Sequence, residues 1–423
     1  MVRSGDRVKL ILKDNSRYEG VLMPSPEALN SKAVVIKLNS GYNIGISKSR
    51  ISRIRLVKKS KIIAEKKKKL KKKKGLPAVT ILSTGGTISS RVDYKTGGVC
   101  PNLIAEDFVE AVPELSNYAN ITAREILKVP SEDLTPKDWI KLAKEVSKEI
   151  KKKVDGIVIT HGTDTMHYSS AALALMLQNL PIPVVFVGSQ RSADRGSSDA
   201  FSNLLAAVIT AARWDGAESV ICMHETSDDI SNIVIRGTKA RKMHTERRDA
   251  FRPINSLPLA RVGYKGGIIN LSEFRKRSDS KPVLNTNLDT KVAFLHVYPG
   301  MNPELIENMI KKEYHGIVLA GTGLGHVPKN LHQIIKKAIK KDIAVVMTSQ
   351  CLYGRTHKFV YSPLRRLWKM GVIFAEDMLP EVAYIKLMQS LAKTRKLDEL
   401  RELMEKNEAG EITECTAPEG FLV

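Results

Sequence analysis

Cysteine is scarce in this chain of 423 residues, which contains only Cys100, Cys222, Cys351 and Cys415. The four lie far apart in the sequence, and none belongs to a CxxC pair. Structural zinc sites and disulfide frameworks depend on closely spaced cysteines, so we expect neither of them. The scarcity also fits the reducing environment of the cytoplasm.

Long apolar runs are missing as well. No stretch approaches the roughly 18 apolar residues that indicate a membrane-spanning helix. The first residues, Met-Val-Arg-Ser-Gly-Asp, contain no apolar signal core. A phosphate-binding loop of the GxxxxGK[ST] kind is absent, because the glycine-rich stretch 321–325 is not followed by a lysine. The sequence therefore favours a cytoplasmic protein without an ATP site of its own.

Positive charge is in excess and is concentrated at the front of the chain. The net charge is +23, with 68 Lys and Arg against 45 Asp and Glu. Residues 1–57 have 11 basic and 4 acidic side chains, and residues 58–74 have 11 lysines against Glu65 alone. The rest of the chain is nearly balanced, so an anionic partner should meet the first 74 residues.

The first 57 residues have the pattern of a small β-barrel. Apolar and polar residues alternate in five short stretches separated by turn residues, near residues 8–12, 18–22, 34–38, 44–47 and 51–57. This pattern predicts an SH3-like or Sm-like barrel, a fold that serves RNA binding and protein docking alike. The Lys-rich linker that follows, residues 58–77, is either a solvated spacer or an arm that binds phosphates.

After residue 77, β-branched apolar stretches alternate with amphipathic segments, which predicts doubly wound α/β sheets. The first α/β unit covers residues 78–270, with strands expected at 78–83, 121–128, 154–160, 183–189 and 218–223. One expected helix of this unit begins at Thr135, and two others span 165–179 and 198–213. A linker at 271–290 leads to a second α/β unit at 291–423, with strands expected at 292–298, 315–320, 343–348 and 371–374, and helices at 303–312, 329–340 and 380–393.

Three hydroxyl-rich stretches follow predicted parallel strands, at 83–89, 129–133 and 161–165. The carboxyl ends of parallel strands share one edge of a sheet, where α/β proteins bind small ligands. Any one stretch is equally consistent with ordinary turn or capping chemistry. Together their hydroxyls, amides and carboxylates predict a site for a small molecule that carries both an ammonium and a carboxylate.

Two of these stretches, LSTGGTI at 82–88 and ITHGTDT at 159–165, resemble the signatures of the type I bacterial and archaeal L-asparaginase family. The resemblance covers residues 78 to about 395 and includes GVIFAEDMLPE at 371–381. It implies two asparaginase-like α/β domains and amide hydrolysis by a threonine nucleophile. Asparaginases lack a basic N-terminal barrel, and in this respect the chain resembles the D-subunit family of archaeal glutamyl-tRNA(Gln) amidotransferases.

The resemblance implies a catalytic role for five residues. Thr87 matches the nucleophilic threonine, and Tyr94, in the glycine-containing loop 89–100, is the tyrosine expected to activate it. Thr163 and Asp164 match the second threonine and its aspartate partner. Lys242 is the expected lysine of this second triad, judged by its spacing ahead of residues 249–251, and Lys239 is its competitor.

A further set of residues is expected to bind the substrate. Ser131 matches the family's substrate-binding serine, and Gly86 and Gly162 are expected beside it. Glu132 stands where asparaginases usually have glutamine, and the D-subunit family tends to have an acid there. This difference argues against free asparagine as the physiological substrate. No metal site is expected.

The D-subunit resemblance implies an amidohydrolase component of a carbon–nitrogen ligase in protein biosynthesis. The chain would release ammonia from glutamine or asparagine for the conversion of Glu-tRNA(Gln) to Gln-tRNA(Gln). It would need no cofactor, because a separate E subunit would handle tRNA(Gln) and use ATP with Mg²⁺. A homodimer is also implied, and no membrane partner. The alternatives are a free L-asparaginase with an accessory barrel and a tRNA-binding protein with a decayed amidase domain.

Overall fold

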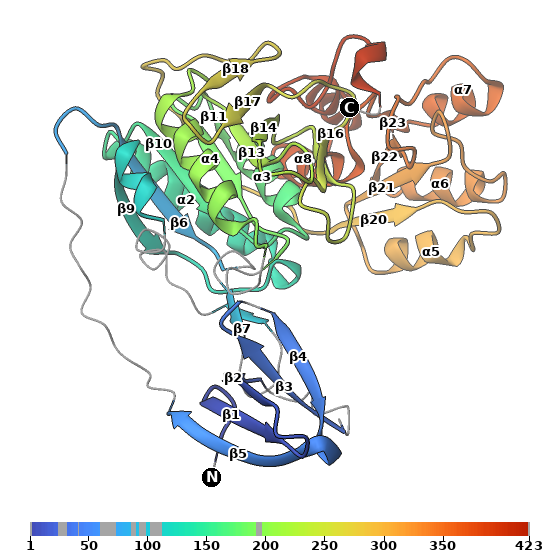
Figure 1. The fold of residues 1–423 in the computed structure, drawn as a ribbon. Helices are drawn as coiled ribbons and strands as arrows, with labels where there is room; N and C mark the ends of the chain where they lie inside the picture. The colour runs from blue at the N-terminus through green and yellow to red at the C-terminus, as the bar shows by residue number, and fades with distance from the viewer. Residues whose placement is uncertain are drawn as a thin grey trace.

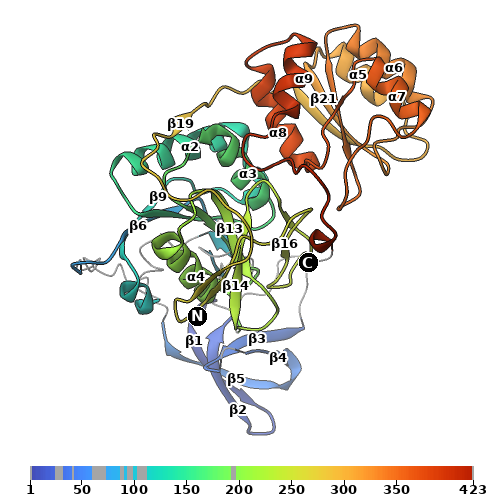
Figure 2. The same cartoon turned by 90° about the horizontal axis from the view of Figure 1, so that it is seen from above.

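The computed structural model describes residues 2–23, 32–40, 42–59, 73–85, 90–92, 99–101, 112–191 and 197–421. Figure 1 shows a small all-β unit at the N-terminus, followed by two α/β domains that lie side by side. Figure 2 shows the same three parts from above, with the C-terminus returning from the second α/β domain toward the first.

The N-terminal unit is a five-stranded antiparallel sheet in the order β4-β3-β2-β1-β5. The strands are β1 (Arg7–Leu12), β2 (Arg17–Leu22), β3 (Ala33–Leu38), β4 (Asn43–Ser47) and β5 (Ile51–Lys58). Alternate side chains of β1 point inward and are buried together with Ile36 and Ile46 in a core of their own. All five predicted strands are present, as expected for a small barrel.

The first α/β domain contains an eight-stranded mixed sheet in the order β18-β17-β14-β13-β12-β10-β6-β9. Its parallel part matches the five predicted strands: β6 (Ala78–Ser83), β9 (Asn120–Glu125), β10 (Gly156–Thr160), β12 (Val184–Val187) and β13 (Ser219–His224). Three antiparallel strands that were not predicted from the sequence extend it: β14 (Ser231–Arg236), β17 (Ala260–Gly263) and β18 (Ile268–Asn270).

Helices cover both faces of this sheet, because strands in a parallel sheet are apolar on both sides. In the described part of this domain the helices are α2 (Pro136–Lys151), α3 (Met166–Met176) and α4 (Ala200–Arg213). Side chains of α2 and α3 belong to one core, and those of α4 belong to a second core on the other face. Helix α2 begins as predicted, with Thr135 and Asp138 forming a capping box and Pro136 in the first turn.

The second α/β domain contains the four-stranded parallel sheet β20-β21-β22-β23. Its strands are β20 (Val292–His296), β21 (Gly316–Gly321), β22 (Ala344–Ser349) and β23 (Ile373–Phe374). Three helices pack against one face of this sheet: α5 (Glu304–Lys311), α6 (Leu331–Ile339) and α7 (Ser362–Lys369). On the other face, α8 (Pro380–Leu391) and α9 (Leu397–Glu405) join the core of the first domain. Helices α7 and α9 were not predicted.

Shorter strands join separate parts of the chain. They are β7 (Ser90–Val92) with β8 (Val99–Pro101), β15 (Ala240–Lys242) with β16 (Phe251–Pro253), and β11 (Leu177–Gln178) with β19 (Val283–Leu284). Strand β19 lies inside the expected linker at 271–290. That segment is therefore attached to the first domain by strand pairing for part of its length.

Two buried ion pairs hold the end of the chain in place. Lys239 Nζ lies 2.7 Å from Asp377 Oδ2, and neither side chain is exposed. Thr413, in the tail after α9, donates its backbone N–H to the other oxygen of Asp377 at 2.9 Å. Lys386 pairs at 2.7 Å with Glu411, which is also buried. Asp377 therefore joins the first domain, the second domain and the C-terminal tail at one point.

We predict that Asp377→Asn lowers the free energy of unfolding by about 3–5 kcal/mol, because it leaves the Lys239 ammonium buried without its carboxylate. Urea denaturation followed by circular dichroism measures the loss. Asp398→Asn is the matched control, since that side chain is 94% exposed. It should change the free energy by less than about 0.5 kcal/mol. Equal denaturation midpoints for both variants would contradict the prediction.

Candidate active site

Three loops meet at the carboxyl edge of the first sheet, where β10, β6 and β9 run parallel as neighbours. The loop after β6 starts with Thr84, whose backbone N–H and hydroxyl both donate to Thr160 O at 3.0 Å. Val129 N–H in turn donates to Thr84 O at 3.2 Å. These bonds bring the hydroxyl-rich stretches together, as their positions after parallel strands lead one to expect.

Close packing at Gly162 joins the second and third loops. A Cβ atom at this position would lie 2.7 Å from both Cβ and Oγ of Ser131, which leaves no room for a side chain. Thr165 Oγ1 donates to Ser131 O at 2.6 Å and strengthens the same contact. Ser131 begins a short 3₁₀ turn, Ser131–Asp133, and is buried, whereas Glu132 beside it is exposed at the edge.

Lys242 joins the site from β15. Its Nζ donates to Thr163 Oγ1 at 2.9 Å and to Asp164 Oδ1 at 2.7 Å. The Thr163 side chain is buried and that of Asp164 is 66% exposed, so the ammonium lies between the interior and the mouth of the site. Strand β15 is held by antiparallel pairing with β16, in which Lys242 is opposite Phe251.

Lys239, the alternative lysine, lies elsewhere. Its fully buried Nζ is bonded to Asp377, and burial lowers the pKa of Lys239 while Asp377 opposes that shift. Of the two lysines, the one that contacts Thr163 and Asp164 is Lys242. Three other residues predicted to belong to the site, Gly86, Thr87 and Tyr94, lie outside the described part of the chain.

A chain of buried hydrogen bonds that was not predicted from the sequence holds the loop after β10, which contains His161 and Gly162. Trp139 Nε1 donates to Ser169 Oγ at 3.1 Å, and Ser169 Oγ lies 2.8 Å from His161 Nε2. His161 Nδ1 lies 2.7 Å from Gly162 O, an atom that can only accept. Nδ1 therefore carries the proton, and Nε2 accepts from Ser169. Burial lowers the pKa of His161 to about 4, so the imidazole is neutral at pH 7.

Glu381, His167 and Arg241 form a mostly buried cluster beside β15, and no sequence motif indicates it. Glu381, at the start of α8, has one oxygen 3.8 Å from His167 Nε2 and the other 3.7 Å from Arg241 Nη1. Burial raises the pKa of Glu381 and lowers that of His167 to about 3. Arg241 directly precedes Lys242, so the second domain contacts the strand that carries the site lysine.

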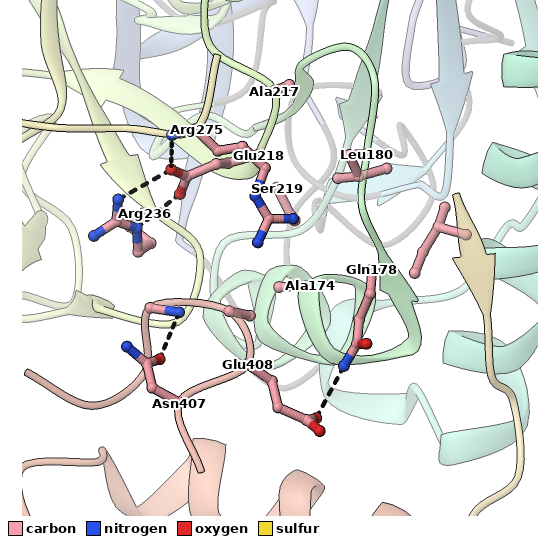
Figure 3. A pocket seen from close by; sticks show the side chains of 13 residues that line it. Ala174, Gln178, Leu180, Ala217, Glu218, Ser219, Arg236, Arg275, Asn407 and Glu408 are labelled. Atoms are coloured by element: carbon pink, nitrogen blue, oxygen red, sulfur yellow. Dashed lines mark hydrogen bonds and ion pairs between the residues drawn. The ribbon is translucent and has the colours of Figure 1, made fainter. Parts of the chain in front are cut away.

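A separate cavity of about 280 Å³ lies between α3, the start of β13 and the loop 407–410 (Figure 3). Of its two carboxylates, Glu218 pairs with the Arg236 guanidinium at 2.7 and 3.0 Å and accepts the backbone N–H of Arg275 at 2.8 Å, and Glu408 accepts from Gln178 Nε2 at 2.9 Å. None of the residues that line this cavity belongs to the three hydroxyl-rich loops. Among the described residues, no group of three or more His, Cys, Asp or Glu is placed to hold a metal ion.

No helix in the described ranges is long and apolar enough to pass through a membrane.

Three protein families match successive parts of the chain. Residues 2–57 match the GatD N-terminal domain, residues 78–275 the N-terminal asparaginase domain, and residues 291–404 the C-terminal domain of glutaminases and asparaginases.

Known proteins resemble the whole chain or its asparaginase-like part. The D subunit of the glutamyl-tRNA(Gln) amidotransferase of Pyrococcus furiosus is 48% identical and that of Pyrococcus abyssi 46% identical, covering all of this chain and 98% and 97% of those proteins. The thermostable L-asparaginase from Thermococcus kodakarensis superimposes with a TM-score of 0.72 at 34% identity. That match covers 80% of this chain and all of the asparaginase.

We predict that Gly162→Ala lowers the free energy of unfolding by about 1–3 kcal/mol, because the new methyl group would overlap Ser131. Urea denaturation measures this loss. Gly267→Ala is the matched control, since a Cβ atom there would meet nothing within 4 Å. It should leave stability unchanged or raise it by up to about 1 kcal/mol. Similar stabilities for the two variants would show that the loops move apart without cost.

Proposed function

Because the chain belongs to the D-subunit family of glutamyl-tRNA(Gln) amidotransferases, we propose that it is the amidase of such an enzyme. It releases ammonia from glutamine or asparagine, and the ammonia is used to convert Glu-tRNA(Gln) to Gln-tRNA(Gln). The observation that carries this proposal is the contact of the Lys242 ammonium with Thr163 and Asp164, directly beside the buried Ser131 loop. This arrangement supplies the proton-handling group that a threonine nucleophile needs.

The proposed reaction proceeds in two steps. Thr87 Oγ attacks the side-chain amide carbon, its proton passes to a neighbouring base, and the C–N bond breaks as the leaving nitrogen is protonated to ammonia. Water then attacks the ester carbon and regenerates the Thr87 hydroxyl, releasing glutamate or aspartate. Tyr94 is assigned to activating Thr87, and Thr163, Asp164 and Lys242 to moving protons.

The substrate's charged groups meet complementary atoms at the same edge. Ser131 and the backbone beside Gly162 are assigned to binding the substrate, together with Gly86. Glu132 is exposed at the mouth, where its carboxylate can attract the substrate's ammonium. Asparaginases usually have a glutamine at this position. The negative charge of Glu132 therefore changes how the site binds a charged amino acid, which argues against free asparagine as the physiological substrate.

The remaining assignments concern partners. A partner, the E subunit, would bind ATP and Mg²⁺ and would activate the glutamyl ester of tRNA(Gln). A homodimer of this chain is the expected assembly. The Lys-rich stretch 58–74 would help to gather tRNA through its phosphates. Most of this stretch lies outside the described residues. At its end, Lys73 contacts the first domain through Asn120 and Ser116.

We predict that Thr87→Ala lowers amide hydrolysis at least about 10³-fold, since removing a nucleophile removes the covalent route. The measurement is ammonia release from glutamine and asparagine, with and without the partner, ATP and Glu-tRNA(Gln). Thr87→Ser keeps the hydroxyl and should retain measurable activity. Residual activity of Thr87→Ala above about one per cent would rule out the nucleophile.

The same assay separates the alternatives. An amidotransferase component forms Gln-tRNA(Gln) only when the partner is present. A free asparaginase hydrolyses asparagine without any dependence on tRNA. A decayed amidase releases no ammonia under any of these conditions.

We predict that Lys242→Met lowers the rate by about 100-fold or more, the scale expected for a positioned acid–base group. The thermal transition should stay close to that of the wild type, because the ion-pair partner Asp164 is 66% exposed and stays solvated when the ammonium is removed. Lys239→Met is the comparison and should instead reduce stability, since Asp377 then remains buried without its partner. A large loss of rate in Lys239→Met while it is still folded, with a small loss in Lys242→Met, would reverse the assignment.

A further inference from the structure

A basic hollow lies on the second α/β domain, between α6 and α7. It has a volume of about 410 Å³ and is lined by four cationic and two apolar side chains: Lys336, Lys340, Arg366, Lys369, Ile339 and Met370. No carboxylate is among the lining residues. The hollow therefore combines a concentrated positive charge with two apolar side chains.

The four cations of this basic hollow have no anionic partner in the described part of the chain. Nearby, Lys337 is paired with Glu307 at 3.1 Å, and Arg365 Nε donates to Phe359 O at 2.6 Å. The four lining side chains, by contrast, form no ion pair or side-chain hydrogen bond with any described residue. Folding has thus placed four charges around one hollow without neutralising them from the residues that the structure describes.

The surrounding sequence maintains the same sign of charge. Residues 329–341 contain five lysines and residues 362–370 contain three basic side chains, and neither stretch contains an acidic residue. His332, on α6, responds to this charge: burial and then the Arg366 guanidinium lower the pKa of His332. Cations at the C-terminal end of a helix interact favourably with the helix dipole, and α6 and α7 each have two of the four there, but this interaction does not require the two helix ends to line one hollow.

We propose that the basic hollow binds the phosphodiester backbone of RNA. The composition favours nucleic acid over protein, because lysine is depleted in protein–protein interfaces whereas nucleic-acid interfaces are strongly positive. Lysine and arginine donate to phosphate oxygens without reading the base sequence, so contacts here would fix the position of the RNA. This inference rests on the proposed function, which supplies tRNA as the RNA.

The basic hollow is remote from the candidate active site. Helices α6 and α7 pack on the face of the second sheet opposite to α8, which is the helix that joins the first domain. Figures 1 and 2 both place α6 and α7 at the end of the second domain that is far from α3, and Figure 1 shows them far from β10 as well. Charge changes in the hollow can therefore be tested without altering the residues around Lys242.

The test compares two full-length variants with equal net charge. The hollow variant carries Lys336→Gln, Lys340→Gln, Arg366→Gln and Lys369→Gln. The control neutralises four exposed lysines that do not form a cluster, through Lys265→Gln, Lys281→Gln, Lys312→Gln and Lys393→Gln. Affinity for tRNA(Gln) is measured by fluorescence anisotropy at several salt concentrations, and the melting temperature of each variant is checked.

The salt dependence gives the expected result. Four lost phosphate contacts reduce the slope of log K against log salt by about 3, at roughly 0.7–0.9 per contact. The ratio of wild-type to hollow-variant affinity should then fall about 60-fold between about 50 and 200 mM salt, while the ratio for the control stays nearly constant. A charge-preserving variant, Lys336→Arg with Arg366→Lys, should bind tRNA as the wild type does.

Two results would overturn the inference. One is the same slope for the hollow variant and the control. The other is unchanged tRNA binding with weakened assembly between the chain and its partner, which would make the hollow a protein contact. Hydrolysis of glutamine and asparagine is measured in parallel and should be the same in both variants. If the wild type itself hydrolyses neither amide, the proposed function fails, whatever the tRNA result.

Discussion

The Lys242 ammonium reaches Thr163 and Asp164 because several unrelated constraints place one short strand at the edge of a parallel sheet. Strand β10 must end beside β6, so that the loop carrying Thr163 lies next to the loop carrying Thr84. Gly162 must lack a side chain for that loop to approach Ser131. Strand β15 must lie across the mouth, and its pairing with β16 holds it there. The geometry of the candidate site is therefore a product of the fold and not of any one loop.

Much of this arrangement could be predicted from the sequence, because its signals are local. The β-branched stretches predict the parallel strands, and the hydroxyl residues directly after those stretches predict at which edge of the sheet the site lies. The antiparallel strands β14, β17 and β18 were missed because they pair with strands that precede or follow them closely in the sequence and do not follow the alternation of strand and helix. Helix α7 has only eight residues and three basic side chains, which resembles a polar loop in sequence.

The buried charges were beyond the reach of sequence reasoning. Lys239, Lys386 and Glu411 belong to residue types that usually lie on the surface, and only the structure shows that their side chains are almost completely buried. The same holds for Glu381, which is buried against His167 and Arg241. All of them lie where the two α/β domains and the tail meet. Hydropathy cannot reveal such a place, because the carboxylate that compensates each lysine is distant in sequence.

Helix α8 belongs to the core that the two domains share, and this has a consequence during synthesis. Side chains from Leu82 to Met404 contribute to that one core, so the first domain cannot complete it when its own last strand has been made. More than a hundred further residues must leave the ribosome before α8 can pack against α3. Until then the nascent chain exposes an apolar face. Chaperone binding during translation, and the spacing of slow codons, should therefore matter more for this protein than the stability of the finished fold suggests.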